Sequence, residues 1–170
     1  MKTKKLIALF EKVQQIPYKV CKFDEGGIHP SLKEGDCRHK AVLLKKLLEH
    51  EGFEVKKLSV VFDWGDLPLP QEMLGILKSG TVWDHHALTV NVNGKWIKVD
   101  CTWDPALAKI GFPVTKDWNG VSDTQQVTEG SLEFYDSDGY VRNEKEIKIV
   151  KGEAYAFAEA LNDWMRGGKK

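Results

Sequence analysis

Two strand-like runs joined by Asn93-Gly94 constrain the fold of this chain more than any other feature of its sequence. In residues 86–92 every second side chain after the first is apolar, and residues 95–101 follow the dipeptide with another strand-like run. Asn-Gly between two such runs is a strong signal for a β-hairpin, because both residues tolerate positive φ. The sequence therefore predicts an antiparallel pair of strands near the middle of the chain.

Helical patterns occur on both sides of this hairpin. Apolar residues recur at helical spacing from Leu6 to Ile16, before Pro17. Asp36 is a good N-cap for a second helix with a Leu-rich buried face, and Gly52 is a plausible end for it. The other predicted segments are a loop over 21–35, a strand over 55–62, a loop over 63–70, a short helix over 71–78, an irregular arm over 105–126, a second hairpin over 132–142, a last strand over 146–150 and a C-terminal helix over 154–165.

This order, with helices first and antiparallel strands after them, predicts an α+β fold. At 170 residues the chain suits one well-buried core. We therefore expect a single domain over residues 1–166, followed by a disordered tail over residues 167–170.

Charge and cysteine content narrow the class of protein. The 25 basic and 25 acidic residues cancel, which disfavours nucleic acid and anionic membranes as partners. Charged residues interrupt the N-terminal apolar run, and no stretch reaches the roughly 20 apolar residues of a membrane span, so we expect a soluble protein. Three cysteines argue against a secreted disulfide framework and favour the reducing cytoplasm.

The thiol of Cys37 is the leading candidate for chemistry. Because Asp36 is the predicted N-cap, Cys37 lies in the first turn of the second helix, where unpaired N–H groups and the helix dipole favour a thiolate. The same helix terminus offers a backbone N–H to an oxyanion. A cysteine beside a Leu-rich helix is also a common small core residue, so this position alone does not establish a nucleophile.

An imidazole and a carboxylate follow in the predicted hairpin. His86 begins the first strand, whose alternate apolar residues are predicted to face the core, and Asp100 ends the second strand. A thiol nucleophile needs an imidazole as proton acceptor and donor, and the imidazole needs a third group to fix its orientation. Either residue also has an ordinary structural interpretation, as a core histidine and as a strand-end cap.

Three separated motifs connect these residues. They are Gly35-x-Cys37 with Ala41 one turn later, then His86-Ala87, and then Gly94-Lys95-Trp96 leading to Val99-Asp100-x-Thr102. In this order they resemble the core of the transglutaminase-like superfamily, over about residues 30–105. The resemblance implies a papain-like fold, with a nucleophile helix packed on an antiparallel β-sheet, and a triad of Cys37, His86 and Asp100. Two departures are Leu88 in place of the usual aromatic residue and Cys101 in place of the common Pro.

The register of the hairpin decides which histidine meets Asp100. A plain two-residue turn pairs residue 87 with residue 100, which leaves His86 and Asp100 on opposite faces of the sheet. One extra loop residue or a bulge brings His86 onto the face of the carboxylate, and we expect that register. The plain turn instead nominates His85 as the base, or Asp104 as the acid.

These residues predict a thiol-dependent acyl-transfer enzyme that forms a thioester from an amide bond in a protein or peptide-like substrate, without a cofactor. Hydrolysis and amine transfer both stay open. We expect Trp83 and Trp103 to line the substrate cleft, because they flank the triad segments. The alternatives are a transglutaminase-like domain that binds or scaffolds without turnover and, less favoured, a metal site. The metal site is disfavoured because adjacent strand residues such as His85 and His86 point to opposite faces.

Overall fold

The Asn93-Gly94 dipeptide forms a two-residue turn between strands β2 (Val82–Val92) and β3 (Lys95–Val99). Both turn residues have positive φ, 53° at Asn93 and 86° at Gly94, which suits the twist of an antiparallel pair. Val92 pairs with Lys95, and the pairing continues evenly to Leu88 and Val99. The predicted hairpin is confirmed. The longer or bulged register that we expected is wrong, because the left-handed turn closes the hairpin with two residues.

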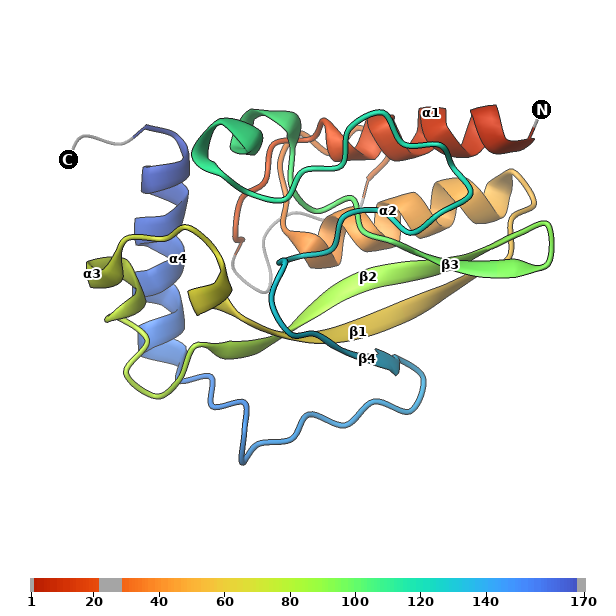
Figure 1. Cartoon of the computed structure of the whole chain (residues 1–170). Coiled ribbons are helices and arrows are strands. Elements are labelled where there is room, and N and C mark those ends of the chain that lie inside the picture. Colours follow the sequence, from red (N-terminus) through yellow and green to blue (C-terminus); the bar gives the residue numbers. More distant parts are fainter. Residues whose placement is uncertain (1, 22–28, 168–170) are drawn as a thin grey trace.

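The computed structural model describes residues 2–21 and 29–167 and combines helices with an antiparallel sheet (Figure 1). Its helices are α1 (Lys2–Gln14), α2 (Cys37–His50), α3 (Gln71–Leu74) and α4 (Lys151–Met165), with short 3-10 helices η1 (Trp64–Asp66) and η2 (Pro105–Ile110). Strands β1 (Val55–Asp63) and β4 (Glu133–Asp136) join the hairpin in a four-stranded sheet of order β3-β2-β1-β4. The predicted α+β class is confirmed.

Two apolar clusters hold these elements together. Helices α1 and α2 lie side by side over the sheet, and α4 stands at its end (Figure 1). The first cluster joins α1 and α2 to β2 and β3 through residues such as Phe10, Leu44, Leu88, Val90 and Ile97. The second cluster is rich in aromatic residues and joins β1, η1, η2 and α4 through residues such as Phe62, Trp64, Trp103, Phe112 and Phe157.

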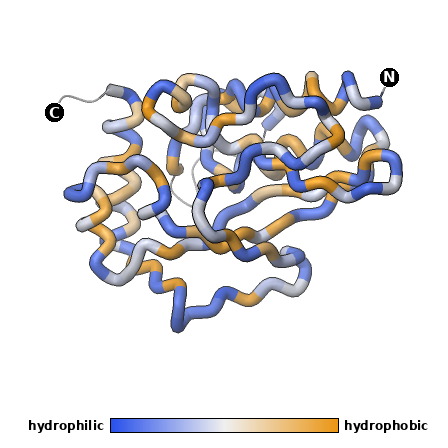
Figure 2. The backbone as a smooth tube through the Cα atoms, viewed as in Figure 1, coloured by the Kyte–Doolittle hydropathy of each residue, from blue (hydrophilic) through white to orange (hydrophobic). Residues whose placement is uncertain are grey.

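Hydropathy follows these layers. Hydrophobic and hydrophilic residues alternate along most helices and strands, as expected for elements with one buried face (Figure 2). In β1, Leu58, Val60 and Phe62 share one face and are all buried, whereas Val61 and Asp63 on the other face are half-buried. Strand β2 is buried on both faces, since Ala87 and Leu88 are neighbours and both are buried. Ala87 belongs to the aromatic cluster, and Leu88 belongs to the cluster under α1 and α2.

The segment after β4 differs from the prediction. Residues 140–142 and 146–150, all within the described part of the chain, are not strands, so the second hairpin and the last strand are wrong. Strand β4 pairs with β1 instead, with Val60 opposite Phe134. The following segment is held by side chains, because Arg142 makes two hydrogen bonds of 2.8 Å to the carboxylate of Asp84.

The predicted helices over 6–16, 36–52 and 154–165 correspond to α1, α2 and α4, and the arm over 105–126 is irregular apart from η2. The predicted short helix over 71–78 is confined to α3. The predicted loop over 21–35 lies partly outside the described residues, as do residues 168–170 of the predicted tail. Among residues 2–21 and 29–167, no helix combines the length and apolar character needed to cross a membrane.

Candidate active site

Asp36 caps α2 and thereby sets the position of Cys37. Its Oδ1 accepts a hydrogen bond of 3.0 Å from the backbone N–H of Arg38, and its own N–H donates to Nδ1 of His39. The helix begins directly after the cap, so Cys37 is the first helical residue and is half-buried. The predicted N-cap is confirmed, and the Cys37 sulfur lies at the positive end of the helix dipole.

His85 and Asp100, from the β2–β3 hairpin and the residue after it, form a buried pair. Nε2 of His85 lies 2.7 Å from Oδ2 of Asp100, and the two residues are only 3% and 6% exposed. Continuing the pairing of Leu88 with Val99 by one residue places Ala87 opposite Asp100, so His85 shares the face of the carboxylate. The two-residue turn thus sets the register that brings together a histidine and an aspartate 15 residues apart in sequence.

The pKa of His85 depends on Cys37 as well as on Asp100. Burial alone would lower the pKa of His85, but the negative charges of Asp100 and Cys37, with side-chain hydrogen bonds to both, raise it to about 10. Burial would likewise raise the pKa of Asp100, but the charge and hydrogen bond of His85 hold it below its usual value. The structure therefore brings Cys37, His85 and Asp100 together.

His86 does not join this group. It is the next residue along β2, so its side chain points to the other face of the sheet, and it is exposed. The expectation that His86 would meet Asp100 fails with the register on which it depended. Asp104, the other alternative acid, is engaged elsewhere: it accepts hydrogen bonds from the backbone N–H groups of Tyr18 and Ala106.

Two threonines that the sequence interpretation missed support the carboxylate. Thr102 donates its backbone N–H to Oδ1 of Asp100 over 3.0 Å, and its hydroxyl lies 3.4 Å from Nε2 of His85. Thr124, far away in the irregular arm, accepts the backbone N–H of Asp100 at 2.8 Å. The sequence signal for Thr102 was its place in the motif after Asp100, whereas nothing local marked Thr124.

A cavity of about 540 Å³ opens onto the thiol and the imidazole. Trp83 and Trp103, the predicted cleft residues, both line it, and Trp103 is fixed by a 2.8 Å hydrogen bond from its indole N–H to the carbonyl of Val127. Trp64 also lines the cavity, although it does not flank the segments of the predicted triad. Helix α4 forms another part of the wall, with Phe157 packed against Trp64 and Trp83 at ring-centroid distances of 5.0 and 5.8 Å.

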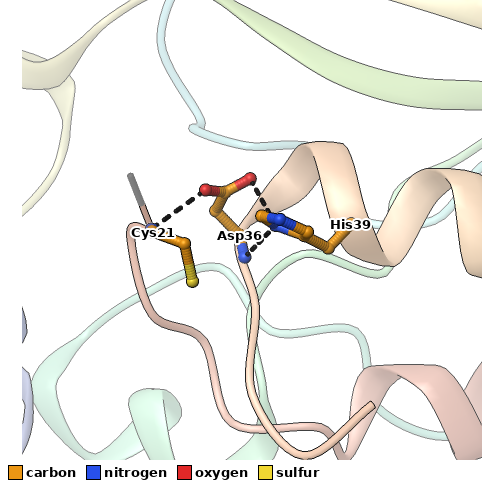
Figure 3. Close-up of side chains that lie close together, drawn as sticks. All are labelled: Cys21, Asp36 and His39. Atoms are coloured by element: carbon orange, nitrogen blue, oxygen red, sulfur yellow. Dashed lines mark hydrogen bonds and ion pairs between the residues drawn. The ribbon is translucent and has the colours of Figure 1, made fainter. Parts of the chain in front are cut away.

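Among the described residues, Cys21, Asp36 and His39 form a group of potential metal ligands within 4.8 Å of one another (Figure 3). Asp36 already accepts hydrogen bonds at both oxygens, from the N–H of Cys21 at 3.1 Å and from the guanidinium of Arg38 at 2.9 and 2.5 Å. A metal ion there would have to displace or oppose that guanidinium. We therefore interpret the group as a cap that ties residue 21 to the start of α2.

Comparisons with known proteins add no family assignment. No protein-family model, no curated protein and no solved structure matches the chain. The resemblance to the transglutaminase-like core stays a prediction, and the chemistry of the site has to be inferred from its own residues.

Proposed function

We propose that this protein is a transglutaminase-like cysteine enzyme that acts on amide bonds of a protein or peptide-like substrate. Cys37 is the nucleophile, His85 is the proton donor and acceptor, and Asp100 orients the imidazole. The observation that carries the proposal is the buried 2.7 Å contact between His85 and Asp100, on an imidazole that also interacts with the Cys37 thiol. A thiol, an imidazole and a carboxylate linked in this order are the parts of a nucleophilic triad.

In the proposed reaction, the thiolate sulfur of Cys37 attacks the amide carbonyl carbon and forms a tetrahedral oxyanion. The backbone N–H of Cys37 is the proposed donor for that negative charge, because those of Arg38 and His39 already donate to the side chain of Asp36. The C–N bond then breaks, and the imidazolium proton of His85 goes to the departing amine. Water or a second amine, deprotonated by the neutral imidazole, attacks the thioester and releases Cys37 as a thiolate.

The raised pKa of His85 suits the first half of this cycle. With a pKa of about 10, the imidazole holds its second proton at neutral pH, so a proton is available for the leaving amine. The charge of Asp100 stabilises the same protonated state. Hydrolysis and amine transfer diverge only at the thioester, and the competing acceptor decides the product.

The lining of the cavity suits a substrate whose acyl group has apolar parts. Trp64, Trp83 and Trp103 supply aromatic walls, while Arg38 and Asp84 provide charged groups at the same cavity. All three cysteines of the chain are free thiols, which fits the reducing cytoplasm that we propose as the location.

An activated ester tests the proposal without knowledge of the natural substrate. With p-nitrophenyl acetate, we expect a burst of about one equivalent of nitrophenolate and an acetyl thioester on Cys37, located by peptide mass spectrometry. The variant Cys37→Ser should lose the burst, whereas Cys21→Ser, the matched control at a second thiol of the same cavity, should keep it. A burst that survives in Cys37→Ser, or acetylation shared equally by the cysteines, would reject the assigned nucleophile.

A further inference from the structure

Lys40 occupies a position that a lysine rarely takes. It lies in the first turn of α2, three residues after Cys37, and its side chain is 0% exposed. A buried ammonium is costly unless hydrogen bonds replace its hydration. Here Nζ donates to three backbone carbonyls: Gln14 at 3.0 Å, Ile16 at 2.8 Å and Thr102 at 2.8 Å. These bonds use all three donors of the ammonium group.

The three carbonyls belong to two segments that are far apart in the sequence. Gln14 is the last residue of α1 and Ile16 lies two residues beyond it, whereas Thr102 lies two residues after Asp100. Thr102 in turn donates its N–H to Asp100 and places its hydroxyl 3.4 Å from His85. One ammonium group therefore connects the helix that carries the thiol to the segment that carries the acid.

Burial and neighbouring groups have opposite effects on the pKa of Lys40. Burial lowers its pKa to about 8, although the negative charges of Cys101, Asp104 and Asp100 act in the opposite direction. Lys40 contacts neither the imidazole nor the sulfur in these hydrogen bonds, so it has no place among the reacting groups. Its contacts are instead those of a residue that fixes the distance between two parts of the site.

We propose that Lys40 is a positioning residue, which holds the Cys37 end of α2 in register with the segment from Asp100 to Thr102. This inference rests on the proposed function, because it explains how the thiol is kept within reach of His85. A different role would be general stability, since replacing Lys40 leaves three carbonyls without their hydrogen bonds from Nζ. The two roles differ in what happens to the reactivity of Cys37.

The test compares alkylation of Cys37 by iodoacetamide at pH 6 in the wild type and in Lys40→Met, with the labelled peptide quantified by mass spectrometry. Methionine keeps an unbranched side chain that is one atom shorter, and it removes every hydrogen bond to the three carbonyls. We expect the rate at Cys37 to fall about tenfold or more, because a displaced helix terminus weakens the ion pair with His85.

Two control variants separate positioning from stability. Leu48→Ala removes a fully buried side chain near the far end of α2, and Lys46→Met removes an exposed lysine of the same helix. Both should retain the wild-type rate within about twofold at temperatures where they are folded, because neither touches the site. An equal loss of reactivity in Leu48→Ala would assign the effect to general loosening and overturn the proposal.

Folding of Lys40→Met is checked by circular dichroism, and Lys40→Gln, which keeps two N–H donors, serves as the second variant. Lys40→Gln should react at a rate between those of Lys40→Met and the wild type. If neither variant folds, Lys40 serves the stability of the whole chain, and the positioning role is wrong. A wild type without reactivity at pH 6 would reject the proposed function, whereas a reactive wild type with an equally reactive, folded Lys40→Met would reject only the role of Lys40.

Discussion

His85 and His86 are neighbours in sequence and both line the cavity, but they differ in burial and in their partners. His85 is buried against Asp100, and His86 is exposed on the other face of β2. Their different environments follow from the period of two along a strand, in which a shift of one residue exchanges the faces. The pair therefore provides an internal control for experiments on the site.

The raised pKa of His85 predicts a dependence of stability on pH. An unfolded histidine has a pKa of about 6.5, whereas His85 has a pKa of about 10 in the folded protein. The folded protein therefore binds the proton more tightly, and this contribution to stability is full below pH ~6.5 and is lost as the pH rises to about 10. The difference in free energy of unfolding between the wild type and His85→Gln should shrink by on the order of a few kcal/mol over that range.

This prediction is checked by urea denaturation at several pH values from 6 to 10. Comparing differences between proteins removes the contributions of other titrating groups, such as Lys40, that both proteins share. His86→Gln is the matched control and should differ from the wild type by a nearly constant amount. A difference for His85→Gln that does not change with pH would show that His85 is not held in its protonated form.

At the scale of elements, the start of α2 depends on Asp36. This side chain caps the helix, pairs with Arg38 and accepts the N–H of Cys21. Burial raises the pKa of Asp36, but the hydrogen bond and charge of Arg38 outweigh it and hold the pKa below its usual value. The charged carboxylate is thus the form that organises the residues before Cys37.

Asp36→Ala should lower the free energy of unfolding by about 2 kcal/mol, since a helix cap is worth ~1 kcal/mol and the ion pair adds to it. Asp36→Asn retains an acceptor for the cap and should lose less. Guanidinium denaturation measures both values. An Asp36→Ala variant as stable as the wild type would mean that the cap and the ion pair contribute nothing to α2.

Local signals account for the elements that the sequence predicted correctly. Asp36 before a Leu-rich run and the dipeptide Asn93-Gly94 act through their nearest neighbours, so a helix start and a hairpin were predictable. The predicted placement of His86 beside Asp100 failed for a different reason. It depended on an extra loop residue, whereas the φ values of the turn favour two, and that register nominates His85.

Contacts between distant segments were not predictable from local patterns. Lys40 falls at an unremarkable position of a helix and becomes buried only because α1 and residue 102 converge on it. Thr124 reaches Asp100 across 24 residues of sequence. The predicted strand over 146–150 failed for the same reason, because its β-like pattern found no neighbouring strand and the chain there is followed directly by α4.

At the scale of the whole molecule, α4 closes the cavity at the end of the sheet. Phe157 packs on Trp64 and Trp83, and Asn162 exchanges two hydrogen bonds with the backbone of Val20. Helix α4 and the segment around Val20 thus form one wall of the cavity together. Residues near the start of the chain and residues of the C-terminal helix both line the cavity.

Phe157→Ala should lower the free energy of unfolding by about 3–5 kcal/mol, because a large aromatic side chain leaves a fully buried site. Tyr155→Ala, a change at an exposed aromatic residue of the same helix, should cost far less. Chemical denaturation measures both. Similar costs for the two variants would indicate that α4 is not packed on the aromatic cluster.

The most direct test of the central claim is the pH dependence of Cys37 alkylation by iodoacetamide in the wild type, His85→Ala and His86→Ala. A thiolate paired with His85 predicts substantial alkylation well below pH ~8.5, the ordinary pKa of a free thiol, in the wild type and in His86→Ala. His85→Ala should lose this reactivity at low pH. Ordinary thiol behaviour in all three proteins, or a loss confined to His86→Ala, would contradict a triad of Cys37, His85 and Asp100.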